Sequence, residues 1–234
     1  LMRVIKLLQK RYMKLLFLGC SWTWGDELQN REKERYSSII GQRLNADVVN
    51  LSTPGYSNHA IARIFLDQNL EQYDYVFVQL THPSRVEFFD ESGLAANIQN
   101  KRLREKLWKK FKQEKANLRY KKSMYTSKLW HRVMVDRKRF METGYKLDGK
   151  EWWEIYYEEI YHDKFGDSEE MLMYNLIRNR LTLLNKKHVI SSINPKCKVP
   201  VDLLLNNSKY PRAQGNHPNH MGHLMVASDI MKLL

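Results

Sequence analysis

The chain has 234 residues, of which 43% are hydrophobic and 12% aromatic. This composition is sufficient for one well-buried α/β domain and excludes an intrinsically disordered chain. Its apolar runs are only a few residues long, whereas a membrane-spanning helix needs roughly 20 apolar residues. Two cysteines cannot form a disulfide framework, so we expect a cytoplasmic protein with no transmembrane segment.

The net charge of +13 is concentrated in one segment. Sixteen of the 39 Lys and Arg residues, but only three of the 26 Asp and Glu residues, lie between residues 101 and 140, so the rest of the chain is neutral overall. Aromatic residues are interleaved with these cations, as in surfaces that grip phosphates and stack on bases. We therefore predict that residues 101–140 bind nucleic acid or another polyanion. An acidic partner protein and an anionic membrane are the alternatives.

In the first part of the chain, short apolar runs alternate with helical patterns. The sequence predicts strands at residues 15–19, 48–51 and 75–80, and helices at residues 36–44 and 58–70. Such an alternation is typical of a parallel sheet that is covered by helices on both faces.

The pattern breaks at residue 97 and resumes later. Residues 151–161 are an aromatic-rich helix candidate, and Asp167 and Glu170 have capping-box spacing before a helix predicted at residues 171–184. A strand at 188–193 and a helix at 220–234 follow. We predict one domain over residues 1–234, a three-layer α/β/α sandwich, with a basic, aromatic-rich helical insertion at residues 97–165.

The residues that follow the predicted strands suggest a chemistry. Ser21 follows the first strand, Gly55 and Asn58 follow the second, residues 81–85 (Thr-His-Pro-Ser-Arg) follow the third, and His217 precedes the last helix. Ligands bind at the carboxyl ends of parallel strands. A serine, backbone amides and a histidine gathered there are the parts of an acyl-transfer site.

Three segments resemble the SGNH (GDSL-like) hydrolases. Residues 18–25 (Leu-Gly-Cys-Ser-Trp-Thr-Trp-Gly) are similar to the first block of that family, residues 50–58 to the second, and His217-Pro218-Asn219 to the last. The resemblance covers roughly residues 15–90 and 186–234, and the overall pattern is similar to divergent SGNH-like proteins of tailed phages. It implies a flavodoxin-like parallel sheet and hydrolysis of an O-acyl or O-acetyl ester without a cofactor. Ser21 would be the nucleophile, His217 the base and Gly55 an oxyanion-hole residue.

The chain also departs from the family pattern. Cys20 stands where the first block has an aspartate, and the third block lacks its asparagine. Thr81, Ser84 and Arg85 are candidate donors in place of that asparagine, and Asn58 is a further candidate for substrate binding. Gln214 stands where the last block has an acid, three residues before the histidine. The site is therefore a Ser-His dyad, borrows an acid from elsewhere, or is inactive. In the last case the chain would be a binding protein that uses its basic insertion.

Simpler interpretations apply to several of these residues. Ser21 is also a favoured helix N-cap, and Asp26 and Glu27 are expected as acids in the first turn of a helix. His217, His220 and His223 are three residues apart instead of the i, i+4 spacing of a helical zinc site. We therefore expect no metal, and we expect His220 and His223 to be surface or packing residues.

Overall fold

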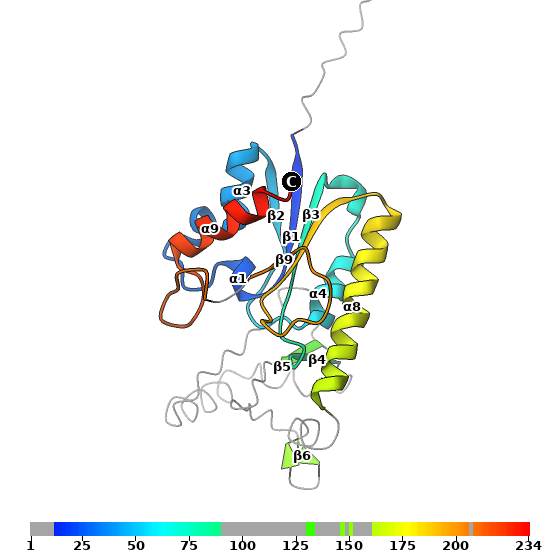
Figure 1. The fold of residues 1–234 in the computed structure, drawn as a ribbon. Helices are drawn as coiled ribbons and strands as arrows, with labels where there is room; N and C mark the ends of the chain where they lie inside the picture. The colour runs from blue at the N-terminus through cyan, green and yellow to red at the C-terminus, as the bar shows by residue number, and fades with distance from the viewer. Residues whose placement is uncertain (1–11, 90–129, 134–145, 148–149, 152–160, 206–207) are drawn as a thin grey trace, which may run out of the picture.

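The computed structural model describes residues 12–89, 130–133, 146–147, 150–151, 161–205 and 208–234. Its centre is a sheet of five parallel strands in the order β2-β1-β3-β8-β9 (Figure 1). These strands are β1 (Lys14–Leu18), β2 (Asp47–Asn50), β3 (Tyr75–Leu80), β8 (Lys187–Ser192) and β9 (Leu203–Leu204). The first four lie within one residue of their predicted positions.

Helices cover both faces of the sheet. In Figure 1, α3 (Tyr36–Leu44) and α9 (His220–Met231) lie on one side of the strands, and α4 (Asn58–Leu66) and α8 (Asp163–Leu183) lie on the other. The predicted α/β class with a central parallel sheet is confirmed. None of the described helices is long and apolar enough to cross a membrane.

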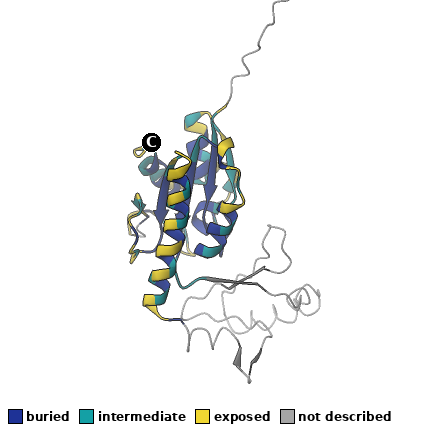
Figure 2. Cartoon of the chain, turned by 90° about the vertical axis from the view of Figure 1, so that its right-hand side faces the viewer, coloured by how far each residue is buried: buried dark blue, intermediate teal, exposed yellow. Residues whose placement is uncertain are grey.

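The central strands are continuous apolar runs because both of their faces are covered. Every residue from Leu15 to Leu18 is at most 1% exposed, and the ring of Phe17 stacks on that of Phe77 in β3, with centroids 4.3 Å apart. Figure 2 shows the buried strands beneath α8, whose outer side is exposed. The short elements α1 (Ser21–Trp24), α2 (Arg31–Glu34) and η1 (Leu70–Gln72) lie in the connections.

Helix α8 begins eight residues earlier than the capping-box pattern predicts. Asp163 is its first residue, so Asp167 and Glu170 lie inside the helix and do not cap it. The cap is His162, whose ring nitrogen Nδ1 accepts a hydrogen bond from the backbone N–H of Phe165 at 3.1 Å. A histidine nitrogen thus replaces the oxygen acceptor that the pattern requires, and Glu170 is fully buried instead.

Within the predicted insertion, residues 130–133, 146–147 and 150–151 form strands, and residues 163–165 are the start of α8. At the carboxyl end of the sheet, β4 (Val86–Phe89) pairs in antiparallel fashion with β5 (Trp130–Val133) (Figure 1). A second antiparallel pair joins β6 (Lys146–Leu147) and β7 (Lys150–Glu151). In the insertion, β5, β6 and β7 are thus extended and not helical, whereas the mostly helical insertion as a whole stays a prediction. The rest of the insertion up to residue 160 lies outside the described residues, and so does nearly all of the basic segment 101–140, so polyanion binding stays a prediction.

Candidate active site

Ser21 lies at the end of the first strand and is the first residue of α1. It is 6% exposed, and Cys20, not Ser21, occupies the N-cap position. A glycine is required at position 19, because the Thr23 side chain lies close to the backbone there and a Cβ atom would be 2.3 Å from Thr23 Oγ1. After one turn the helix ends at Gly25, which has the left-handed φ of 80°. The turn thus places the serine at the carboxyl edge of the sheet.

His217 lies on the loop between β9 and α9, which is held by its own hydrogen bonds. The backbone N–H of Ala213 donates to the carbonyl of His217 at 2.9 Å, and Arg212 forms an antiparallel bridge with Pro218. Asn219 then caps α9 through a 3.0 Å hydrogen bond from the Gly222 N–H. The histidine is therefore fixed immediately before the start of a helix.

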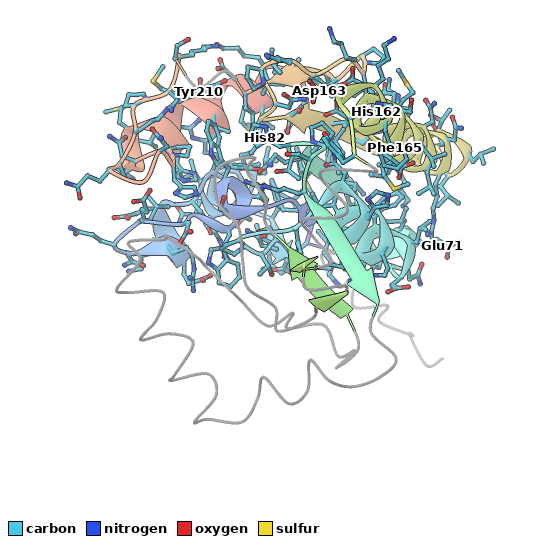
Figure 3. All side chains as sticks on the ribbon, turned by 90° about the horizontal axis from the view of Figure 1, so that it is seen from below. Glu71, His82, His162, Asp163, Phe165 and Tyr210 are labelled. Carbon is cyan, nitrogen blue, oxygen red and sulfur yellow. The ribbon has the colours of Figure 1, made fainter. Side chains whose placement is uncertain are left out.

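The same loop packs against the helix that carries Ser21. The ring of Tyr210 meets that of Trp22 edge to face, with centroids 6.4 Å apart, and the two residues are 2% and 4% exposed. Figure 3, which views the domain from the carboxyl end of the sheet, shows His82 between the loop carrying Tyr210 and the start of α8 at His162. The loops that follow β1, β3 and β9 therefore converge at this end of the sheet.

Glu27 provides His217 with the carboxylate that the sequence motif lacks. Its Oε2 lies 2.7 Å from His217 Nδ1, and the two side chains are 18% and 17% exposed. The backbone N–H of Gly215 donates to Oε1 at 2.7 Å, and that of His217 donates to Oε2 at 3.3 Å. The prediction that Glu27 lies in the first turn of a helix is therefore wrong. The residue follows Gly25 in the loop after α1 and has a φ of 71°.

The hydrogen bonds at Glu27 keep its carboxylate ionised. Burial by itself would raise the pKa of Glu27. The His217 side chain and the backbone N–H groups of Gly215 and His217 outweigh this effect, and the pKa is lowered. An ionised carboxylate at Nδ1 holds the imidazole in the tautomer whose Nε2 is a proton acceptor, and it stabilises the imidazolium after proton transfer.

The sequence does not identify Glu27 as the partner of His217, because the two residues meet only in the folded chain. The residue lies 190 positions from His217 in the sequence, outside the block in which the family acid is found. One feature of the sequence is consistent with the contact, namely Gly215. A Cβ atom at this position would lie 2.4 Å from Glu27 Oε1, so the carboxylate occupies the space of the missing side chain.

In the structure, the hydroxyl of Ser21 and the ring of His217 have other partners. Ser21 Oγ donates to Cys20 Sγ at 3.8 Å, and the described hydrogen bonds of the His217 ring go to Glu27. Catalytic hydrogen bonds often form only in the substrate complex, so the contact between Ser21 and His217 stays a prediction.

The predicted oxyanion residues lie on two loops that are tied to the nucleophile turn and to each other. Gly55 has a left-handed φ of 89° in the turn after β2. The N–H of Thr53 in that turn donates to the Gly19 carbonyl at 3.3 Å. Asn58 uses both ends of its amide on the backbone of Thr81, accepting at 2.8 Å and donating at 3.2 Å. Asn58 therefore positions the Thr81 loop.

The remaining predicted donors lie on the turn after β3. Thr81 is fully buried, and its hydroxyl makes no hydrogen bond to a nitrogen or oxygen atom. Ser84 and Arg85 are half-buried, and the N–H of Arg85 closes the turn by donating to the His82 carbonyl at 3.1 Å. The guanidinium Nη1 of Arg85 is buried and has no hydrogen-bond partner. Among the described residues, this turn thus holds a cation with an unused donor.

His223 is a packing residue. Its ring is fully buried, lies against Tyr36 at a centroid distance of 5.7 Å, and accepts a hydrogen bond from the Tyr36 N–H at Nδ1 (3.1 Å). His220 is exposed. Among the described residues, no three His, Cys, Asp or Glu side chains are placed to hold a metal ion.

The neutral state of His223 predicts that the protein loses stability in acid. Burial, with smaller contributions from the charges of His220 and His217, lowers the pKa of His223 to about 3. The unfolded state binds a proton below about pH 6.5, whereas the folded state does not. The free energy of unfolding should therefore fall by about 1.4 kcal/mol per pH unit as the pH drops from about 6 to 4.

Urea unfolding at pH 7, 5 and 4 measures this slope. The variant His223→Gln keeps an acceptor for the Tyr36 N–H but does not titrate, so the difference between the two proteins isolates the contribution of His223. Equal slopes in both proteins would contradict the prediction.

Comparison with known proteins gives structural similarity alone. Neither a protein-family model nor a curated protein sequence matches the chain. Among solved structures, the lipase Lip_vut3 from a goat rumen metagenome is 12% identical, with 94% of this chain and 97% of that one covered and a TM-score of 0.44.

Two further structures are similar at the same level of identity. For the psychrotrophic esterase EstA from Pseudoalteromonas sp., identity is 12%, coverage 94% of both chains and the TM-score 0.45. A protein from Desulfitobacterium hafniense that is described as belonging to the G-D-S-L family is 12% identical. The match covers 95% of this chain and 99% of that one, with a TM-score of 0.36. The chain is therefore an α/β protein with a central parallel sheet, and its similarity to these proteins is one of fold.

Proposed function

We propose that the chain is a serine hydrolase that cleaves an O-acyl or O-acetyl ester. Ser21 would be the nucleophile, His217 the general base and Glu27 the acid that orients the base. The observation that carries the proposal is the 2.7 Å contact between Glu27 and Nδ1 of His217. A histidine held in this way before a helix, on a loop that packs against α1, is prepared to act on the serine that begins α1.

The reaction proceeds by the usual two acyl-transfer steps. Ser21 Oγ attacks the ester carbonyl while His217 Nε2 takes the hydroxyl proton, and the resulting oxyanion is held by backbone amides of Ser21 and Gly55 with the Thr81–Arg85 turn. The tetrahedral intermediate collapses, the alcohol leaves with the proton from His217, and an acyl-serine remains. Water, deprotonated by His217, then releases the carboxylic acid and regenerates Ser21.

A fluorophosphonate probe tests this proposal directly. The probe phosphonylates an activated serine, so mass spectrometry of the labelled protein should place one adduct on the peptide that contains Ser21. The variants Ser21→Ala and His217→Ala should not react. Labelling elsewhere, or none in the wild type, would refute the proposal.

The close approach of Glu27 to Gly215 predicts that Gly215→Ala impairs the enzyme. The added methyl group would occupy the position of the carboxylate and displace Glu27 from His217. We expect a loss on the order of 10²-fold in kcat, as for other misplacements of about 1 Å in an active site. Hydrolysis of a small aryl ester measures the effect, and unchanged kcat would show that the Glu27–His217 contact does not contribute. The control is Gly166→Ala on α8, where the added methyl group would lie nearest to the Tyr161 side chain and not to Glu27.

A further inference from the structure

Tyr36 contacts two elements that carry different parts of the proposed site. It is the first residue of α3 and is 2% exposed. Its hydroxyl lies 2.6 Å from Oγ1 of Thr23, which follows Ser21 by two residues in α1. Its backbone N–H donates to Nδ1 of His223 in α9 at 3.1 Å, and α9 begins three residues after His217. Tyr36 therefore joins the helix of the proposed nucleophile to the helix that follows the proposed base.

Gln79 of β3 fixes the directions of the hydrogen bonds around Thr23. Its Nε2 donates to the Leu80 carbonyl and to Cys20 Sγ, both at 3.1 Å, so its amide nitrogen faces these two acceptors. Its Oε1 therefore accepts from Thr23 Oγ1 at 2.7 Å. Because a threonine hydroxyl has only one hydrogen, Thr23 must accept from the hydroxyl of Tyr36. Tyr36, Thr23 and Gln79 thus form a hydrogen-bonded connector from α3 through α1 to β3.

The three residues of this connector are removed from solvent. Tyr36, Thr23 and Gln79 are at most 2% exposed. A buried polar group that loses its partner cannot bond to water instead, so breaking one of these hydrogen bonds costs more than breaking an exposed one. The connector therefore favours a single arrangement of the elements that it joins.

Helix α1 depends on such contacts because it is only four residues long. Its backbone closes the turn with a hydrogen bond from the Trp24 N–H to the Cys20 carbonyl at 2.9 Å. A single helical turn is unfavourable by itself, since it fixes several residues for few hydrogen bonds. The Thr23 carbonyl is also held, because it accepts from Asn50 Nδ2 of β2 at 2.9 Å. Contacts with neighbouring elements, and not α1 alone, therefore set the position of Ser21.

On the side of α9, ring packing is added to the hydrogen bond. The Tyr36 ring lies against that of His223, with centroids 5.7 Å apart, and meets that of Phe17 in β1 edge to face at 6.0 Å. His223 is fully buried. Asn219, which caps α9, lies between His217 and His223 in the chain. A shift of His223 would therefore move the start of α9 and His217 with it.

We propose that Tyr36 and Thr23 are positioning residues that fix Ser21 and His217 relative to each other. Tyr36 holds α1 through its hydroxyl and α9 through its N–H and its ring, and Gln79 anchors the connector to the sheet. Tyr36 and Thr23 are buried and act without touching the substrate. The effect on catalysis rests on the proposed hydrolase function, whereas the connection of α1 to α3 and α9 does not.

Hydrogen–deuterium exchange tests the connection without any substrate. Tyr36→Phe removes the hydroxyl and leaves the ring and the N–H in place. With the bond to Thr23 lost, the turn of α1 should open more often, and the amides of Trp24 and Gly25 should exchange about tenfold faster than in the wild type.

Tyr174→Phe is the matched control for this experiment. Tyr174 is also buried, and its hydroxyl donates at 2.9 Å to the Pro200 carbonyl, on the face of the sheet that α8 covers (Figure 1). Unchanged exchange of the Trp24 and Gly25 amides in Tyr36→Phe, or equal acceleration in Tyr174→Phe, would overturn the connector whether or not the protein hydrolyses esters.

Hydrolysis of a chromogenic acetate ester tests the positioning role, at a temperature where circular dichroism shows each variant to be folded. Tyr36→Phe should lower kcat by roughly 10- to 100-fold and leave KM little changed, because the substrate does not meet Tyr36. Thr23→Ala should lose at least as much. Thr23→Ser, which differs from Thr23→Ala by the hydroxyl alone, should recover most of the loss, and Tyr174→Phe should have the kcat of the wild type.

The two experiments separate the failure of this proposal from the failure of the hydrolase function. An active wild type with an unchanged kcat in Tyr36→Phe, or with no recovery in Thr23→Ser, would overturn the positioning role while the hydrolase function stands. A wild type that hydrolyses no ester would refute the hydrolase function and the positioning role together, and the amide exchange of α1 would still decide whether the connector exists.

Discussion

Replacing Ser21 by alanine is expected to lower kcat for ester hydrolysis by roughly 10⁴- to 10⁶-fold, the range found when the nucleophile of a catalytic triad is removed. The fold should not change, because Ser21 is a small residue at the start of a four-residue helix and its side chain caps nothing. Initial rates with a chromogenic acetate ester measure the loss, and circular dichroism confirms that the variant is folded.

The matched control is Ser168→Ala. Ser168 lies on the exposed side of α8, where its hydroxyl bonds only to the carbonyl of Lys164 four residues earlier, so kcat should equal that of the wild type. If Ser21→Ala retained most of the activity while folded, another residue would be the nucleophile and the proposed function would have to be abandoned.

Replacing Glu27 by glutamine should have the second largest effect, a loss of about 10²- to 10⁴-fold in kcat with a small change in KM. The glutamine amide can present its NH₂ to Nδ1 of His217, which would favour the tautomer protonated at Nε2. That tautomer cannot take the proton of Ser21. A neutral amide also cannot stabilise the imidazolium that forms during the reaction.

Two variants separate this role of Glu27 from a general effect of charge. Glu27→Asp keeps the charge but shortens the side chain, and its activity should lie between those of Glu27→Gln and the wild type. Glu32→Gln removes a carboxylate from α2 that is paired with Arg35 on the surface, and it should leave kcat unchanged. If Glu27→Gln were as active as the wild type, the site would function as a Ser-His dyad.

The sequence by itself determined the parallel sheet and the order of the site residues along it. Strands such as β1 and β3 are buried on both faces, so their apolar runs are visible without knowledge of their partners. The glycine and serine after β1 and the histidine before α9 are local motifs, because they depend on turns made by residues adjacent in the chain. The family resemblance was therefore readable from short blocks.

The sequence pattern failed where a side chain was used in an uncommon way. The N-cap of α8 is a histidine nitrogen, which no standard capping pattern includes, so the helix was placed too late. The prediction that Glu27 is a first-turn acid fails because α1 is only one turn long and ends before it, and a helix of one turn has no periodicity in its sequence.

Only the tertiary structure decided the acid of the site and the environment of Cys20. Glu27 meets His217 across 190 residues of sequence, and Cys20 is brought to Gln79 in the neighbouring strand β3. Hydrogen bonds and Coulomb interactions act through distances in space and not through sequence spacing. Which carboxylate serves the histidine, and which donor meets the buried sulfur, are therefore properties of the assembled sheet and its loops.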